Sequence, residues 1–315
     1  MAPSAQPLRR AGGWLSASAD VPLVCEIAAD YVAAVRHHHG RIEAWAMRSL
    51  PPGAVRPASL AENIADRSAV QQALEHTVGA VADGRRRCAL LVPDLLTRVA
   101  VLEFDHLPER AQEAEALLRW RLGKDLPFDV TQAALSFQAQ PPGRSGGRDA
   151  LVAVSLRNLV RQYEECVEAL GLQPGWVTLS TLAALGGLEA SAGPRLFVKR
   201  DHGSLSVVIA QGEAVRLFRS LPAPAGDALE EEALLEKVYP AAVYFQDHWG
   251  EPVGEAVLVS VGENRLPSAQ RLQRELGCAV TEFSPEAMEL PPSALSGAVS
   301  DTRLAPCWGW VRGGA

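Results

Sequence analysis

The same order of strand-forming and helix-forming segments occurs twice along the chain of 315 residues. In the first half, three β-type runs lie within residues 21–47, and helical and extended runs alternate after them. In the second half, three β-type runs within residues 194–220 are again followed by alternating helical and extended runs. Turns at Gly40 and Gly212 separate strands of each meander. The sequence therefore predicts two similar α/β lobes, each long enough to bury its own core.

A segment at residues 90–137 interrupts the first repeat. It begins with an apolar run, continues as a helix that Pro108 opens, and returns to an extended run after the break Leu126-Pro127-Phe128. Proline is favoured in the first turn of a helix, where its missing N–H has no helical partner. The expected buried stripe of this helix is Ala111, Ala114, Leu118 and Leu122. Residues 138–149 then form a Pro/Gly-rich loop, which predicts a long hairpin connection.

These patterns divide the chain into three parts. We expect a flexible tail at 1–19, a first lobe at 20–190 with an inserted subdomain at about 90–155, and a second lobe at 191–315. The tail carries arginines but no apolar run of signal-peptide length. Within the first lobe, residues 68–82 predict a helix with Ser68 as its N-cap. Within the second, residues 229–249 predict a helix interrupted at Pro240.

Composition excludes several classes of partner. The formal net charge is −7 and the pI is about 5.6, which disfavours a nucleic-acid binder and a protein held on an anionic membrane surface. No apolar run is long enough for membrane insertion. The five cysteines are scattered without a CxxC pair, so we expect buried, reduced thiols in the cytoplasm. The run His37-His38-His39 points to alternate faces of a strand, so no metal site is predicted.

Five pieces of the sequence, in order, resemble the PilM family of actin-like cytosolic proteins of type IV pilus assembly. They are residues 23–35, 50–55, 91–128, 151–184 and 251–280. The third piece is the most similar, because it combines a strand, a helix after Leu-Pro-Glu and an extended run after Leu-Pro-Phe. This resemblance implies a duplicated actin-like (ribonuclease H-like) α/β fold with two lobes. In ATP-binding relatives, a hairpin from each lobe and a glycine-rich turn hold the nucleotide.

The first nucleotide hairpin departs from the pattern that the resemblance implies. Glu26 stands at the position of an acid that holds hydrated Mg²⁺, Ala28 at that of a glycine, and Ala33 at that of a lysine. A glycine there allows close backbone approach to phosphate, and the lysine supplies positive charge. Asp30 lies in the turn, where its carboxylate would repel a phosphate.

The second hairpin and the third element depart as well. Lys199 or a neighbouring residue stands at the acid position, and the segment Asp201-His202-Gly203-Ser204 carries a displaced Asp-x-Gly. Gly262 is the one glycine left in the third element, and Glu263 adds a negative side chain. We therefore expect a degenerate pocket with weak or absent ATP binding and no hydrolysis. The alternative keeps ATP and Mg²⁺ as cofactors, with Asp201 or Glu26 holding the metal.

The resemblance also implies a partner. We expect a non-catalytic scaffold that binds the cytoplasmic N-terminal segment of a PilN-like bitopic protein of the inner membrane, and homo-oligomers remain open. An extended peptide would lie near residues 90–137, held by backbone pairing and apolar pockets. One alternative is an active actin-like ATPase of pilus assembly. Another is the cytosolic domain of an L-type platform protein of type II secretion, which we disfavour because no membrane helix precedes Ala315.

Overall fold

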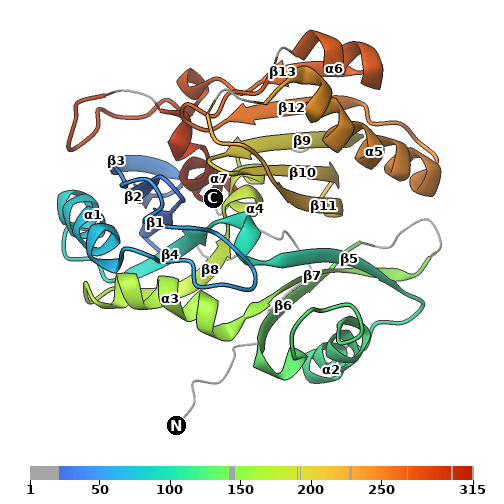
Figure 1. The fold of residues 1–315 in the computed structure, drawn as a ribbon, viewed down its shortest axis with the longest axis horizontal. Helices are drawn as coiled ribbons and strands as arrows, with labels where there is room; N and C mark the ends of the chain where they lie inside the picture. Colours follow the sequence, from blue (N-terminus) through green and yellow to red (C-terminus); the bar gives the residue numbers. More distant parts are fainter. Residues whose placement is uncertain are drawn as a thin grey trace.

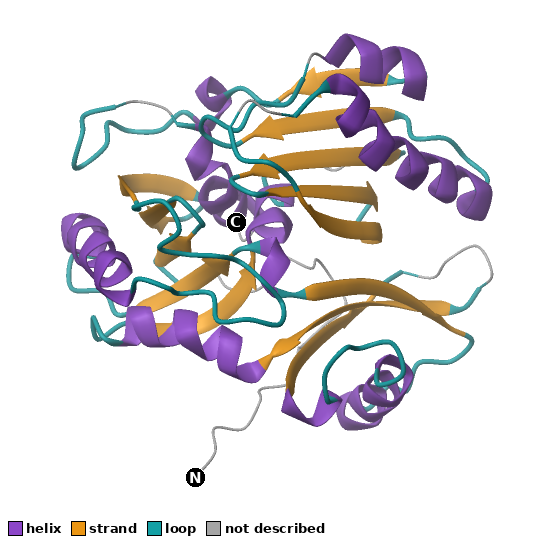
Figure 2. Cartoon of the chain, viewed as in Figure 1, coloured by secondary structure: helices purple, strands orange, loops and turns teal. Residues whose placement is uncertain are grey.

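The computed structural model describes residues 21–141, 146–189, 191, 193–226, 229–267, 269–298 and 301–313. The expected tail at 1–19 lies outside these residues. Two five-stranded sheets and one three-stranded sheet, with helices against them, make up the described chain (Figures 1 and 2). In the described residues, no helix is both long and apolar enough to cross a membrane.

The first and second lobes repeat one sheet plan. The first sheet has the order β3-β2-β1-β4-β8 and the second has the equivalent order β11-β10-β9-β12-β13. In each, the three meander strands are antiparallel and the last two strands run parallel to the first. The first sheet comprises β1 (Leu23–Ile27), β2 (Tyr31–His38), β3 (Arg41–Ser49), β4 (Arg87–Val92) and β8 (Gln173–Leu179). The second comprises β9 (Pro194–Asp201), β10 (Ser204–Gln211), β11 (Ala214–Pro222), β12 (Glu255–Ser260) and β13 (Ala279–Glu282). The duplicated plan expected from the sequence is confirmed.

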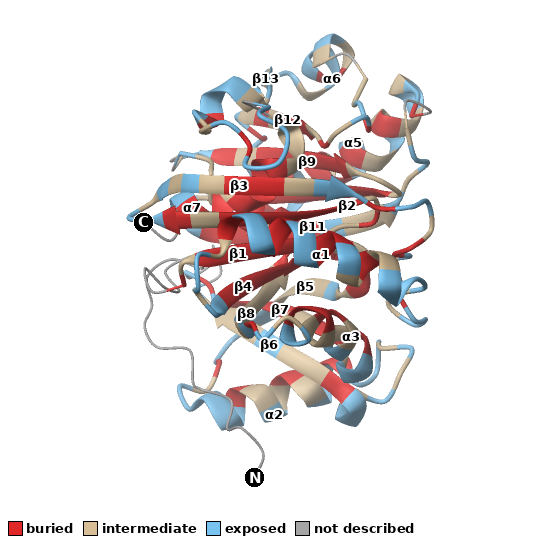
Figure 3. Cartoon of the chain, turned by 90° about the vertical axis from the view of Figure 1, so that its left-hand side faces the viewer, coloured by how far each residue is buried: buried red, intermediate tan, exposed pale blue. Residues whose placement is uncertain are grey.

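Helices cover the sheets and join the lobes. The first lobe carries α1 (Arg67–Val81) and α3 (Arg157–Glu168), and the second carries α5 (Glu231–Trp249) and α6 (Ala269–Leu276). Strands β1, β2 and β4 are almost wholly buried between neighbours and helices (Figure 3), as their continuous apolar runs predict. Two short helices, α4 (Ser180–Leu185) and α7 (Ala305–Gly313), cross each other in the centre of the molecule (Figure 1).

The crossing of α4 and α7 depends on a glycine. A Cβ atom added at Gly309 would lie 2.4 Å from the carbonyl oxygen of Ala183 and 2.7 Å from that of Ala184. No side chain fits in that space, so the two backbones are in direct contact.

A third sheet lies between β4 and β8 in sequence. It has the antiparallel order β5-β7-β6, formed by β5 (Arg98–Phe104), β6 (Ala133–Ala139) and β7 (Arg148–Leu156). Helix α2 (Ala111–Leu122) packs against it through Ala114, Leu118 and Leu122. We call this unit, residues 98–156, the insert; it has a separate apolar core and lies at the lower right of Figure 1. The connection expected at 138–149 is shorter at both ends, because β6 continues to Ala139 and β7 begins at Arg148; its residues 142–145 lie outside the described ranges.

Two helix starts differ from the sequence expectation. Helix α1 begins one residue earlier than expected, because Asp66 and not Ser68 is the N-cap: its Oδ1 accepts a hydrogen bond of 2.9 Å from the amide of Ala69. Helix α2 begins only at Ala111, so Pro108 precedes the helix instead of opening it. Ala111 is exposed, so it does not belong to the buried stripe that the sequence predicted. Asp and Ser both favour the N-cap, and Asp66 lies two residues before Ser68, the N-cap expected from the sequence.

Helix α5 also differs, because it continues through Pro240 without a break. Pro240 is exposed, so water can bind the carbonyl that loses its amide partner.

The cysteines and histidines occupy ordinary structural positions. All five cysteines are free and buried, as expected from their spacing. His37 is buried, with Nε2 2.7 Å from the carbonyl oxygen of Val21, whereas His38 and His39 are exposed at the turn after β2. Among the described residues, no three His, Cys, Asp or Glu side chains are grouped to hold a metal ion.

Candidate functional site: the cleft between the lobes

The tips of the two nucleotide-type hairpins face each other. Asp30 lies in the turn between β1 and β2, and His202 lies in the turn between β9 and β10, where Gly203 has φ +82°. The Oδ2 atom of Asp30 is 3.8 Å from Nδ1 of His202. Burial raises the pKa of the Asp30 carboxyl, and the nearby His202 acts against this rise. The two turns therefore contact each other where the lobes meet.

Lys199 is the centre of a buried polar cluster behind these turns. Its side chain, from β9, has no solvent-exposed area. Its ammonium donates a 2.8 Å hydrogen bond to Oγ of Ser180, forms an ion pair with Asp201, and lies 3.7 Å from Oδ2 of Asp94. Burial alone would lower the pKa of Lys199, but the carboxylates of Asp201 and Asp94 outweigh burial and raise it. The ammonium therefore stays charged in the interior.

Glu26 joins the cluster through Ser180. The Oγ of Ser180, at the start of α4, donates a 2.7 Å hydrogen bond to Oε1 of Glu26 on β1. Burial raises the pKa of Glu26 to about 8, although the charge of Lys199 opposes this shift. Glu26 is therefore largely protonated at neutral pH. The Sγ atom of Cys307, on α7, lies 3.8 Å from its other oxygen.

Asp94 connects the cluster to the second sheet. It lies in the short 3-10 helix η1 (Asp94–Leu96) after β4 and is fully buried. Its carboxylate accepts hydrogen bonds from the amide of Thr181 at 3.1 Å and from Oγ of Ser206, on β10, at 2.9 Å. The cluster thus joins Glu26, Asp94, Ser180 and Thr181 of the first lobe to Lys199, Asp201 and Ser206 of the second.

The third nucleotide-type element is covered by a side chain of the same lobe. A Cβ atom added at Gly262 would lie 3.2 Å from Cδ of Arg303, so this side chain lies over the glycine turn. Arg303 is held there by an ion pair of 2.7 Å with Asp301. The amide of Gly262 donates to Oγ1 of Thr302 at 2.9 Å, and Glu263 points to solvent. Residues near the C-terminus therefore occupy the space beside this turn.

The positions singled out from sequence meet only in part. The structure brings Glu26 and Asp201 into one cluster, but through Lys199 and Ser180. Ala28 is half-buried beside the first turn and Ser204 is buried at the start of β10. Gly262 lies under Arg303, and the charges of Arg303 and Glu263 act on the nearby carboxyl of Asp30. Sequence reasoning missed four groups that come from distant segments: Asp94, Ser180, Ser206 and Arg303. One signal was available for Asp94, an acid that follows an apolar strand-forming run after a single proline, Pro93.

The insert is attached to the second lobe by a second polar cluster. Arg216 on β11 forms a 2.9 Å ion pair with Asp149 on β7, and its guanidinium lies 4.3 Å from the ring centre of Trp249. Burial raises the pKa of Asp149, and Arg216 opposes this rise. The amide of Val215 also donates to Oε1 of Gln140 at 2.8 Å. The position of the insert is therefore tied to that of the second lobe.

Strand β6 of the insert has a free edge. Within the described ranges, it forms a ladder only with β7. The amide of Gln140 donates to the carbonyl of Asp149 on the β7 side, so alternation along the strand turns the backbone groups of Leu135, Phe137 and Ala139 outward. The outward carbonyl of Ala133 already accepts a 3.1 Å hydrogen bond from Arg157, which agrees with this alternation.

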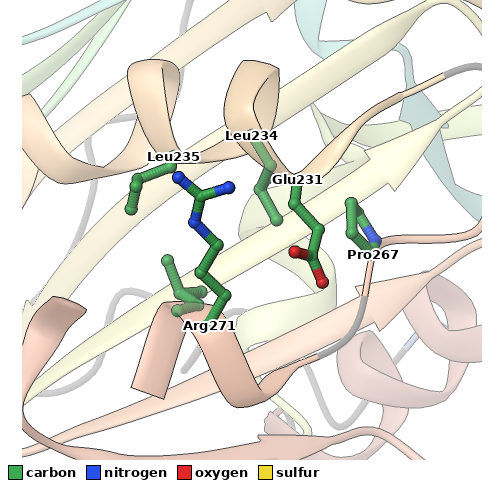
Figure 4. Close-up of a pocket in the computed structure, with 6 residues that line it drawn as sticks. Glu231, Leu234, Leu235, Pro267 and Arg271 are labelled. Carbon is green, nitrogen blue, oxygen red and sulfur yellow. The ribbon is translucent and has the colours of Figure 1, made fainter. Parts of the chain in front are cut away.

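Two hollows are found away from the cleft. One, between α5 and α6, is lined by Glu231, Leu234, Leu235, Pro267, Arg271 and Leu272 (Figure 4). Its volume is about 10 Å³, which is room for about one water molecule. The other is an open polar groove between α1 and α3, where Arg67 pairs with Glu165. Neither hollow adjoins the Lys199 cluster.

Comparison with known proteins supports the fold. No protein-family model and no curated protein sequence matches the chain. A solved structure of a PilM–PilN type IV pilus biogenesis complex is similar, with TM-score 0.72 and 20% identity over 93% of this chain and 98% of that chain. The cytoplasmic domain of EpsL, an inner-membrane component of the type II secretion system of Vibrio cholerae, reaches TM-score 0.49 with 11% identity over 78% of this chain and 83% of that chain. An actin-like ATPase-fold protein of unknown function from Bacteroides thetaiotaomicron reaches 0.48, with 8% identity over 91% and 94%.

The likeness to the PilM–PilN complex extends over both lobes and the region between them, because it covers nearly the whole of this chain. The chain therefore has the duplicated actin-like fold that its sequence resemblance to PilM proteins predicts.

Proposed function

We propose that this protein is a scaffold of the type IV pilus assembly platform that does not hydrolyse ATP. It binds the cytoplasmic N-terminal segment of a PilN-like bitopic protein and so is held on the cytoplasmic side of the inner membrane. The observation that carries this proposal is the structural similarity to a PilM–PilN complex over nearly the full length of both chains.

The chemistry of the cleft supports the absence of nucleotide turnover. Mg²⁺ in a nucleotide site is held by carboxylates together with substrate phosphates. Here the carboxylate of Asp201 is paired with the ammonium of Lys199, and Glu26 is largely protonated at neutral pH. A triphosphate would also meet the side chains of Asp30 and Arg303 in the space beside the turns. These residues do not fit a magnesium–triphosphate complex.

The free edge of β6 supports a site for an extended peptide. Backbone groups of Leu135, Phe137 and Ala139 face away from β7, so an added strand can pair with them. The side chains of Leu135 and Phe137 are half-buried against the insert core, which leaves apolar surface beside this edge. Main-chain pairing gives affinity in this mode, and alternate side chains give specificity.

The test uses a fluorescent peptide with the cytoplasmic N-terminal sequence of the bitopic pilus protein encoded beside this chain. Fluorescence anisotropy with the full chain should show saturable binding. Ala139→Pro removes one outward amide without breaking a β6–β7 bond, and one net hydrogen bond of about 1 kcal/mol corresponds to a loss of about fivefold in affinity. Ala139→Val, which keeps the amide, is the matched control and should bind like wild type.

Three outcomes would count against the proposal. If no cytoplasmic tail of a neighbouring pilus membrane protein binds, the scaffold role is wrong. If Ala139→Pro and Ala139→Val bind equally, the peptide lies elsewhere than on the β6 edge. If calorimetric titration with Mg²⁺ and ATP shows tight binding, the proposed lack of nucleotide turnover loses its support. Light scattering at each step separates peptide binding from pairing of two copies at the same edge.

A further inference from the structure

We infer that the chain's own buried groups fill the interface between the two lobes. At this interface the Lys199 ammonium takes the role of a bound cation, holding the lobes closed without a nucleotide. This inference concerns the resting arrangement of the two lobes. Only its consequence for partner binding rests on the proposed function.

Lys199 lies at the interface between the two lobes. It lies on β9, two residues before Asp201 and the hairpin turn, and its side chain has no exposed area. Its contacts reach both lobes, because Ser180 and Asp94 belong to the first lobe and Asp201 to the second. A single ammonium therefore bridges the interface at the point where the hairpins converge.

Oxygen-bearing side chains surround the ammonium of Lys199. It donates hydrogen bonds to Ser180 and Asp201, whereas the carboxylate of Asp94, at 3.7 Å, lies beyond hydrogen-bond distance and acts through its charge. Ser180 passes its own proton donor to Glu26, and Asp94 takes a further donor from Ser206. Separating the lobes would break the Lys199–Ser180 and Ser206–Asp94 hydrogen bonds, which cross the interface, whereas the Lys199–Asp201 pair lies within the second lobe.

Further contacts between the two lobes lie nearer the surface. Asp30 and His202 connect the two hairpin tips across the interface at 3.8 Å. Trp45 on β3 donates from Nε1 to the carbonyl of Pro291 at 2.7 Å, and the amide of Ala294 donates to the carbonyl of Trp45 at 2.9 Å. The segment after β13 thus reaches from the second lobe onto the edge strand of the first.

Contacts with both lobes hold the insert in place. The second lobe holds the insert through Arg216 with Asp149 and through Val215 with Gln140. The insert is also continuous with the first lobe at β4 and α3. Closed lobes therefore fix the insert from both sides. If the insert binds the partner peptide, its geometry is set by the Lys199 cluster and not by nucleotide.

Double electron–electron resonance between two nitroxide labels measures the distance between the lobes. Nitroxides are placed at Glu75→Cys on α1 and Gln273→Cys on α6, both exposed positions. The five native cysteines are buried, so the introduced thiols react selectively. Lys199→Met is compared with Arg195→Met, which removes a cation from the same strand. Arg195 pairs with Glu255 of the same lobe and also donates to the carbonyl of Glu189, in the segment that joins the lobes, but within the described residues it makes no hydrogen bond or ion pair with the Lys199 cluster.

Wild type should give one narrow distance distribution that does not change when Mg²⁺ and ATP are added at millimolar concentration. Lys199→Met should broaden it and shift it to longer distances, and Arg195→Met should match wild type. The double variant Lys199→Met/Asp201→Asn, which removes a cation and an anion together, should also broaden the distribution. It provides a second test if the single variant does not fold.

Two results would overturn the inference. One is a nucleotide-dependent change of the wild-type distance, a measurement that needs no cluster variant. The other is a wild-type distribution in a folded Lys199 variant. Failure of the scaffold proposal shows separately, as lack of peptide binding with an unchanged, nucleotide-independent distance.

Discussion

The interface between the lobes and the outer edge of the insert differ in how far their polar groups are hydrogen-bonded. In the cleft, buried charged groups such as Lys199, Asp94 and Asp201 are bonded to one another. On the insert, the outward backbone groups of Leu135 and Phe137 have no ladder partner among the described residues. Satisfied groups hold a structure together, whereas unsatisfied groups at a surface are available for recognition. The contrast agrees with the proposal that the peptide binds on the insert while the buried contacts between the lobes contribute to stability.

The strongest test of this contrast removes the central charge of the cleft. Lys199→Met leaves Asp201 and Asp94 without their cation, and losing one partner of a buried ion pair lowers the free energy of unfolding by about 3–5 kcal/mol. Urea unfolding measures the change. Arg195→Met, whose partner Glu255 is partly exposed, should lower it by only about 1 kcal/mol. Equal losses in the two variants would mean that the cleft has no special role.

A second test asks whether the insert depends on the second lobe. Arg216→Met removes the partner of buried Asp149, and we expect a loss of about 2–3 kcal/mol, somewhat reduced because Asp149 can take up a proton. Hydrogen exchange should show faster opening of β5, β6 and β7 than of β1 and β9. Uniform acceleration across all sheets would contradict a local attachment.

A third test uses the pH dependence of the cleft. The folded pKa of Glu26 is raised to about 8, so folding favours the protonated form, and its stabilising contribution is lost as pH rises towards and through that value. Between pH 6 and pH 9 the wild-type free energy of unfolding should fall by about 2–3 kcal/mol from this group. Glu26→Gln cannot titrate and should show a correspondingly smaller fall. Parallel pH profiles for the two proteins would show that ionisation of Glu26 does not cause the fall in stability.

The smallest effect is expected at the free edge. Ala139 is exposed at the end of β6 and its amide faces away from β7, so Ala139→Pro should change the free energy of unfolding by less than about 1 kcal/mol. Thermal or urea unfolding checks this value in the same preparation used for peptide binding. A large loss of stability would show that this edge contributes to folding instead of recognition.

The sequence predicted the fold better than it predicted the cleft. Both meanders and the helix of the insert follow from local periodicity, which short stretches of chain carry on their own. The Lys199 cluster joins Asp94, Ser180 and Ser206, which lie far apart in sequence and meet only after folding. The resemblance to PilM proteins predicts Lys199 or a neighbour at the position of an acid, but the groups that surround Lys199 became visible only in the structure.

The predictions for the start of α1 and for a break in α5 were wrong for a different reason. Asp66 and Ser68 are both good N-caps, and the choice between them depends on packing of α1 against the sheet. The break expected at Pro240 did not occur, because its exposed position lets water replace the missing hydrogen bond. Each error concerns a residue whose local preference allows two outcomes, and tertiary structure selects between them.

The crossing at Gly309 has a mechanical consequence. Because α7 touches the backbone of α4 at Ala183 and Ala184, no layer of side chains lies between the helices to be compressed. The helices cannot approach further, so this crossing sets the shortest distance between the two helix backbones and acts as a rigid spacer in the centre of the molecule.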